Sequence, residues 1–210
     1  LCRSGGQMKI ELHKGDLPEG LKFGPILAID TETMGLDPRR DRLCLAQMTD
    51  GSGIVHIVQF PRPPIFAPRL KSVMEDPDIL KLFHFARFDV ALLRTGIGAN
   101  TKPIYCTKIA SKLCRTFTDR HGLKDLVKEL IGVDLSKVQQ MSDWGAETLT
   151  QVQLDYAASD VIHLHALKDA LDRLLAREGR TALAGACFDF LPVRAELDLL
   201  GWAEEEPFAH

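Results

Sequence analysis

The sequence lacks long hydrophobic runs and an excess of charge of either sign. Its uncharged apolar stretches fall well short of the roughly 20 residues that a membrane-spanning helix needs, so we expect no membrane association. A net charge of −3 argues against the broad basic surface of a protein that binds duplex nucleic acid without regard to sequence. It is compatible with an enzyme that grips a few nucleotides, because divalent cations can supply positive charge locally.

Disulfide and export signals are also missing. The five cysteines include no Cys-x-x-Cys pair, and an odd number fits poorly with a disulfide framework. The first residues lack the basic region and apolar core of a secretory signal. We therefore expect a cytoplasmic protein that starts at Met8, with residues 1–7 an appended or disordered remnant, and one domain over residues 1–210.

Strand-like runs dominate the first half of the sequence and helical spacing dominates the second. The apolar run at 26–31 predicts a buried central strand, and the Asp-Gly-Ser-Gly turn at 50–53 predicts an antiparallel hairpin. Helices are expected over 86–98 and 122–132, then as one long helix over 148–179 with a capping box at Thr150, then as a last helix interrupted or restarted at Pro192. This order predicts an α/β fold with a mixed sheet flanked by helices.

Four acids and a tyrosine follow these elements in a notable order. Asp30 and Glu32 are two apart at the end of the central strand, so their side chains project to the same side of the sheet. Asp89 lies near a helix start, and Tyr156 and Asp160 are four apart on one helical face. Each pattern alone has an ordinary structural explanation. The first pair suits a plain strand end, Asp89 suits a first-turn aspartate that complements the helix dipole, and the last pair suits an exposed helix surface. Together they predict a site for Mg²⁺ or Mn²⁺, because a hard cation relieves the repulsion between clustered carboxylates.

The order of these residues resembles the tyrosine-bearing branch of the DEDD exonuclease superfamily. The matching motifs are DTE at 30–32, ARFD at 86–89 and YAASD at 156–160, and the segment 122–160 is similar to ribonuclease D. The similarity runs from about residue 26 to residue 167. It implies a ribonuclease H-like α/β fold and a 3′→5′ exoribonuclease that releases nucleoside 5′-monophosphates.

The resemblance also implies a two-metal-ion mechanism. Two cations about 4 Å apart can activate a water and stabilise the leaving 3′ oxygen. The metal ligands would be Asp30, Glu32, Asp89 and Asp160. Tyr156 would complete the catalytic set by orienting the attacking water. A phenol with a pKa near 10 keeps its proton at neutral pH, so orientation suits it better than deprotonation of the water.

Residues beside the acids are expected to hold the terminal nucleotide. Met34 and Leu36 would offer apolar surface to the last base, or else are core residues on a turn, and Trp144 lies at the site mouth or anchors the core. Related motifs often have a small or amide residue where Phe85 stands, which leaves its role open. The whole predicted set is Thr33, Met34, Gly35, Leu36, His84, Phe85, Gln140 and Trp144, with Arg39, Arg40, Arg42 and Lys137 either guiding phosphates or forming solvated surface.

The expected partner is the 3′ end of single-stranded or short-tailed RNA. Only residues 161–210 follow the last acid, too few for the C-terminal helical (HRDC) domains of longer ribonuclease D proteins. We therefore expect a short form that acts on shorter or less structured RNA, alone or as an oligomer. The same four acids serve DNA exonucleases, so DNA is an alternative substrate. A non-catalytic nucleic-acid-binding module is a further alternative, disfavoured because all four acids are present.

Overall fold

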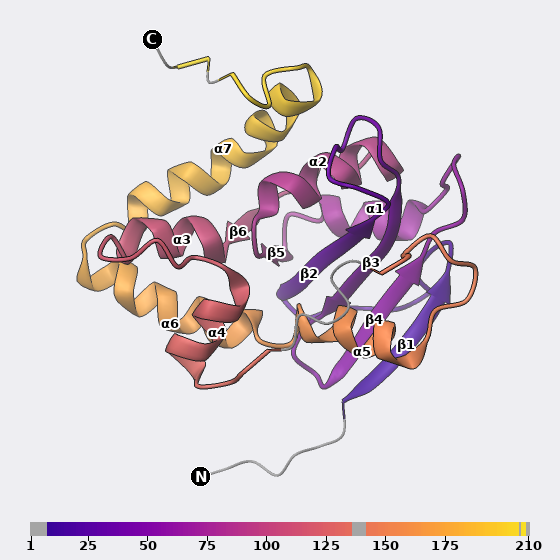
Figure 1. Cartoon of the computed structure of the whole chain (residues 1–210), viewed down its shortest axis with the longest axis horizontal. Helices are drawn as coiled ribbons and strands as arrows, with labels where there is room; N and C mark the ends of the chain where they lie inside the picture. The colour runs from indigo at the N-terminus through magenta and orange to yellow at the C-terminus, as the bar shows by residue number, and fades with distance from the viewer. Residues whose placement is uncertain (1–7, 136–141, 206, 209–210) are drawn as a thin grey trace.

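The computed structural model describes residues 8–135, 142–205 and 207–208. The expectations for residues 1–7, Lys137 and Gln140 fall outside these ranges. Within them, one six-stranded sheet has the order β1-β4-β3-β2-β5-β6 (Figure 1). The strands are β1 (Lys9–Lys14), β2 (Ile26–Thr33), β3 (Leu43–Thr49), β4 (Ile54–Gln59), β5 (Leu80–Phe83) and β6 (Ile104–Cys106).

The sheet is mixed, as the sequence predicts. The hairpin of β3 and β4 is antiparallel, and β2 pairs antiparallel with β3 but parallel with β5. Strand β1 pairs parallel with β4 at one edge and β6 parallel with β5 at the other. Every residue of β3 is buried. The centre of the sheet is therefore covered on both faces, which explains the near-continuous apolar runs of β2 and β3.

Helix α5 and a group of four other helices flank different parts of the sheet. Figure 1 shows α5 crossing the side of the sheet formed by β1, β4 and β3, and α3, α4, α6 and α7 gathered beyond β5 and β6. Among the described helices, none is long and apolar enough to cross a lipid bilayer. The helices are α1 (Pro68–Glu75), α2 (Ala86–Ile97), α3 (Thr107–Cys114), α4 (Leu123–Ile131), α5 (Gln151–Ser159), α6 (Leu164–Arg177) and α7 (Thr181–Leu199).

The single long helix predicted over 148–179 is wrong, because the chain breaks between α5 and α6. The capping box at Thr150 is confirmed, with both of its hydrogen bonds to Gln153 present. At the other end of α5 the Ser159 hydroxyl donates to the carbonyl oxygen of Tyr156 at 2.7 Å, a local bond that competes with helix continuation. Helix α5 packs on β1, β3 and β4, whereas α6 packs on β2 and β5. Asp160 consequently caps the end of α5.

The predicted interruption at Pro192 is also wrong. Helix α7 continues through this proline, although proline removes one backbone donor and costs about 3 kcal/mol in a helix interior. Buried residues on both sides of Pro192, Phe188 and Leu191 before it and Ala195 after it, attach the helix to the rest of the protein. Packing of α7 against α2 and β6 therefore outweighs the local cost.

Candidate active site

Three of the predicted acids meet where β2 ends. Asp30 and Glu32 come from β2, and Asp160 comes from the end of α5. Carboxylate oxygens of the three all lie within 4.8 Å of one another. Because Mg²⁺ and Ca²⁺ bind oxygens at about 2.0–2.6 Å, oxygens with this spacing can share one cation. The partial negative charge at the carboxyl end of α5 favours a cation at the same place.

Asp89 approaches this cluster from α2. It lies in the first turn of the helix and is 3% exposed. The Thr31 hydroxyl, on the strand between the other two acids, donates to Asp89 Oδ1 at 2.7 Å. The charge of Asp89 helps to raise the pKa of both Asp30 and Glu32. The fourth predicted acid therefore belongs to the same electrostatic site.

Burial raises the pKa of all four acids, and repulsion from neighbouring carboxylates adds to it for Asp30 and Glu32. For Asp30, burial is the main cause and repulsion from Asp89, Asp160 and Glu32 adds to it. Burial, with repulsion from Asp160 and Asp89, raises the pKa of Glu32 to about 9. Burial raises the pKa of Asp89 and of Asp160 to about 7. Protons or cations must therefore balance this cluster at neutral pH, and an oxygen-only donor set suits a hard divalent ion.

Gln47 positions Asp30 and was not anticipated from the sequence. Its side-chain amide donates to Asp30 Oδ2 at 2.7 Å. The two residues face each other in the antiparallel pairing of β2 and β3. One signal was available, since Gln47 interrupts the otherwise apolar run Leu-Cys-Leu-Ala-Gln-Met of a fully buried strand. A buried amide needs a partner, and here the partner is a catalytic candidate.

Tyr156 lies one turn before Asp160, and its hydroxyl is hydrogen-bonded to that carboxylate. Burial and the charges of Asp160, Glu32 and Asp30 raise the pKa of Tyr156. The phenol therefore keeps its proton at neutral pH, which suits orientation of a water better than its deprotonation. The ring of Trp144 lies 6.0 Å from that of Tyr156, and Trp144 is 3% exposed. This burial agrees with the core-anchor alternative for Trp144.

The turn after β2 exposes apolar side chains beside the acids. Met34 is 52% exposed and Leu36 is 89% exposed, so the alternative that they are core residues is wrong. The Thr33 hydroxyl donates to the carbonyl oxygen of Gly35. A side chain at Gly35 would overlap the carboxylate of Asp41. Gly35 thus makes room for a residue of its own turn, while Met34 and Leu36 offer surface to a ligand.

His84 and Phe85 connect β5 to α2. His84 shares a hydrogen bond of 2.9 Å between Nδ1 and the Thr107 hydroxyl, and burial lowers the pKa of His84 to about 3. Phe85 adopts a left-handed backbone conformation, with φ at 67°, which is rare for a bulky residue. Phe85 is 44% exposed, and the Lys108 ammonium lies 4.1 Å from the centre of its ring. This strained turn places an aromatic surface beside the first turn of the Asp89 helix.

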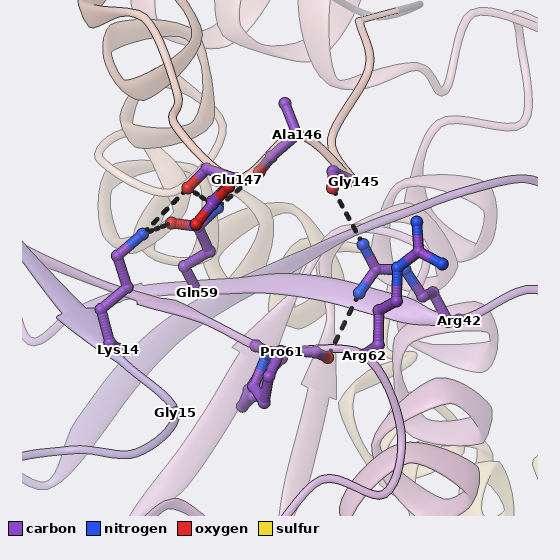
Figure 2. A pocket seen from close by; sticks show the side chains of 10 residues that line it. Lys14, Gly15, Arg42, Gln59, Pro61, Arg62, Gly145, Ala146 and Glu147 are labelled. Carbon is purple, nitrogen blue, oxygen red and sulfur yellow. Dashed lines mark hydrogen bonds between the residues drawn. The ribbon is translucent and has the colours of Figure 1, made fainter.

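A groove of about 670 Å³ adjoins the turn after β2, and Figure 2 shows it from close by. Arg42 donates to the carbonyl oxygens of Pro61 at 3.2 Å and Gly145 at 3.1 Å. The Met34 amide donates to the carbonyl oxygen of Arg42 at 3.2 Å, which links the groove to the turn after β2. Its lining also includes Lys14, Gln59, Arg62 and Glu147.

Two of the other predicted basic residues, Arg39 and Arg40, form local ion pairs. Arg39 pairs with Asp37 at 3.0 Å, and Arg40 pairs with Asp41 at 2.8 Å. Both arginine side chains are largely exposed. Exposed pairs of this kind contribute little to stability, and they agree with the alternative of a solvated surface. Of the four basic residues singled out in the sequence, Arg42 lies in the groove.

The chain is similar to known nucleases. A model of the 3′-5′ exonuclease family matches residues 14–176. A curated ribonuclease D from Granulibacter bethesdensis is 32% identical over 162 residues, which are 77% of this chain and 40% of the relative. The ribonuclease D of Gluconacetobacter diazotrophicus is 34% identical over 77% of this chain and 41% of the relative. The chain thus spans about two fifths of the length of these curated relatives.

Some solved structures match this chain over nearly the whole length of both chains. NrnC of Brucella melitensis with bound Mg²⁺ is 51% identical, with a TM-score of 0.91, and the match covers 97% of this chain and 100% of that one. The same nuclease bound to pGG is 52% identical with a TM-score of 0.92, covering 97% and 99%. Escherichia coli RNase D, described as an exoribonuclease involved in structured RNA processing, is 26% identical with a TM-score of 0.71, covering 82% of this chain and 45% of that one.

Proposed function

Because the chain belongs to the 3′-5′ exonuclease family, we propose that it is a metal-dependent, ribonuclease D-like 3′→5′ exoribonuclease that releases nucleoside 5′-monophosphates. The observation that carries this proposal is the convergence of Asp30, Glu32 and Asp160, with ligating oxygens within 4.8 Å of one another. A non-catalytic binding module would gain nothing from this arrangement, because crowded carboxylates repel the phosphates of a nucleic acid unless cations intervene.

The chain's own residues have separate parts in this reaction. The cations, two Mg²⁺ or Mn²⁺ ions when bound, supply an activated water and stabilise the leaving 3′ oxygen. Asp30, Glu32, Asp89 and Asp160 would hold them, and the Mg²⁺-bound structure of Brucella NrnC supports this choice of metal. Gln47 fixes the Asp30 carboxylate through its 2.7 Å hydrogen bond. Tyr156 retains its proton and orients the attacking water.

The substrate in this proposal is the 3′ end of a single-stranded or short RNA. Met34 and Leu36 present exposed apolar surface next to the acids, where the last bases would rest. The complex of Brucella NrnC with pGG supports a site that accepts very short RNA. Phosphates further from the 3′ end of a longer strand would follow the groove toward Lys14, Arg42 and Arg62. We place this activity in the cytoplasm, in one domain that works alone or as an oligomer.

A product ladder from 5′-end-labelled RNA tests the proposal. With Mg²⁺ or Mn²⁺, we expect progressive shortening from the 3′ end and mononucleotide 5′-monophosphates as products. A chelator should stop the reaction and excess Mg²⁺ should restore it. The matched DNA strand, run in parallel, tests the alternative substrate, and faster loss of DNA would overturn the assignment to RNA. Binding without hydrolysis under every metal tried would overturn the assignment as an enzyme.

A further inference from the structure

A second cluster of ligating side chains lies on the two parallel strands at one edge of the sheet. Glu11 and His13 are two apart on β1, so they share one face of it, and Glu11 pairs in register with His56 on β4. His56 also pairs with Met48 of β3, next to Gln47, which faces Asp30. Successive residues of a strand point to opposite faces. The cluster of Glu11, His13 and His56 therefore lies on the face opposite the catalytic acids.

The spacing of these three side chains is that of a metal site. His13 Nε2 lies 3.1 Å from His56 Nδ1, and His56 Nδ1 lies 3.5 Å from Glu11 Oε2. One ligating atom from each residue lies within 4.8 Å of the other two. A tetrahedral zinc ion binds nitrogen and oxygen at about 2.0–2.2 Å, which sets neighbouring ligand atoms about 3.3–3.5 Å apart. The separation of 3.5 Å lies within this range, and the separation of 3.1 Å lies slightly below it.

The surroundings keep the two imidazoles available as ligands. His56 is buried, and the edge of the Phe23 ring packs against it with ring centres 5.6 Å apart. Burial lowers the pKa of both His13 and His56, so both rings are neutral at neutral pH. Glu11 pairs with Lys9 at 2.6 Å, an exposed ion pair that a stronger ligand interaction can replace. The side chains of Glu11 and His13 are partly exposed, which leaves an entry path for an ion and its water.

We propose that Glu11, His13 and His56 form a second metal site that binds one zinc-type divalent ion, with water completing the coordination. Two imidazole nitrogens and one carboxylate favour Zn²⁺, Co²⁺ or Ni²⁺ over the hard cations that suit the all-oxygen active site. The ligands come from β1 and β4 and lie away from the catalytic acids, so the ion would clamp the edge strand to the sheet. Its contribution is to the stability of β1, because binding to the folded chain alone stabilises it.

Titration with CoCl₂ and then ZnCl₂ tests this site. The full chain should first carry Asp30→Asn and Asp160→Asn, which remove two of the four carboxylate ligands of the active site and so weaken its competition for the added ion. We expect one equivalent of Co²⁺ to give the visible absorption of a low-coordinate nitrogen and oxygen site, and Zn²⁺ to displace it. Zn²⁺ should also raise the melting temperature of this protein, whereas Mg²⁺ should neither displace Co²⁺ nor raise the melting temperature.

Variants at the two partly exposed ligands test whether these side chains bind the ion, and they leave the buried core unchanged. His13→Gln and Glu11→Gln should each weaken Co²⁺ binding by about tenfold or more and remove the Zn²⁺-dependent rise in melting temperature. His121→Gln, a half-buried histidine on a distant segment, is the matched control and should leave both unchanged. Absence of Co²⁺ absorption, or binding that His13→Gln and Glu11→Gln leave intact, would overturn the proposal and leave a hydrogen-bonded histidine pair.

Discussion

Two clusters of ligating side chains lie on opposite faces of the same sheet, and they differ in the atoms that they offer. The cluster at the end of β2 offers only carboxylate oxygens, from Asp30, Glu32 and Asp160. The cluster on β1 and β4 offers two imidazole nitrogens and one carboxylate. Oxygen donors suit Mg²⁺ and Mn²⁺, and nitrogen donors suit zinc-type ions. The comparison teaches that strand alternation can build two sites of different metal preference a few residues apart.

The two clusters also differ in charge. The acids crowd negative charge into a buried place, and the pKa of Glu32 rises to about 9 as a result. The histidines are neutral and share a hydrogen bond without any ion. The acid cluster therefore needs protons or cations, whereas the histidine cluster is stable in their absence. Removal of divalent cations should therefore destabilise the acid cluster more than the histidine cluster.

The largest expected effect is on turnover at the acid cluster. Asp30→Asn removes a charged ligand and should lower the rate of RNA hydrolysis by about three orders of magnitude or more. The folded state should persist, because the change relieves repulsion. Single-turnover rates with labelled RNA measure the effect, with Asp189→Asn, at an exposed position of α7, as control. His13→Gln should leave turnover in Mg²⁺ unchanged, and a comparable loss there would erase the distinction between the clusters.

The second expected effect is on the stability of the metal-free protein. The pKa values of Glu32, Asp89 and Asp160 are raised to about 9, 7 and 7, above the ordinary value near 4 for unfolded carboxyls. These three acids therefore bind more protons in the folded chain than in the unfolded one between about pH 4 and 9, whereas the lowered pKa values of His13, His56 and His84 act in the opposite sense below about pH 6.5. The contribution of the three acids to the free energy of unfolding should fall as pH rises through their window, by at least about 2 kcal/mol, and it is seen most directly above pH 7.

Urea unfolding at about pH 5, 7 and 9, with chelator or with Mg²⁺, measures this slope. Mg²⁺ should flatten it, because cations replace the protons that leave. Asp160→Asn should flatten part of it without any metal. A change in the free energy of unfolding between pH 7 and 9 that is the same with chelator as with Mg²⁺ would contradict the raised pKa values.

A smaller effect is expected where Gln47 orients Asp30. Gln47→Leu removes the 2.7 Å hydrogen bond to Asp30 Oδ2 and should lower kcat by about tenfold. It should also raise the Mg²⁺ concentration needed for half-maximal rate. Thr49→Val on the same buried strand removes a different buried hydrogen bond, to the carbonyl oxygen of Ile54, and serves as control. Equal losses in both variants would indicate a general effect on β3 and not a positioning role.

The smallest effect is expected in the groove, which belongs to neither cluster. Arg62→Gln should raise KM by roughly threefold for RNA of ten or more nucleotides and leave KM for a dinucleotide unchanged, because it removes one long-range phosphate contact. The difference should shrink as salt is added. Arg173→Gln on α6 is a charge-matched control far along the chain from the groove residues. An equal rise for both RNA lengths would place the phosphate path elsewhere.

Local patterns predicted much of the fold and the core of the site. Strand alternation placed Asp30 and Glu32 on one side of the sheet, and the capping box at Thr150 fixed the start of α5. The Asp-Gly-Ser-Gly turn predicted the hairpin of β3 and β4. These features depend on residues close in sequence, which is why the sequence alone was sufficient.

Features that depend on distant pairing were not predictable in the same way. The chain breaks after Ser159, and the two helices on either side of the break pack on different strands. Helix α7 passes through Pro192 because packing outweighs the local cost. Gln47 acquires its role from the register of β2 and β3. The histidine cluster joins residues 43 positions apart through the parallel pairing of β1 and β4. Spacing along the chain carries no information on such registers.

Anomalous scattering from crystals soaked in MnCl₂ tests the central claim most directly. We predict Mn²⁺ peaks coordinated by the carboxylates of Asp30, Glu32, Asp89 and Asp160, and none at His13 and His56. Mn²⁺ peaks at the histidines with none at the acids, or no peak at the acids at saturating MnCl₂, would contradict the account of the chain as a metal-dependent exonuclease.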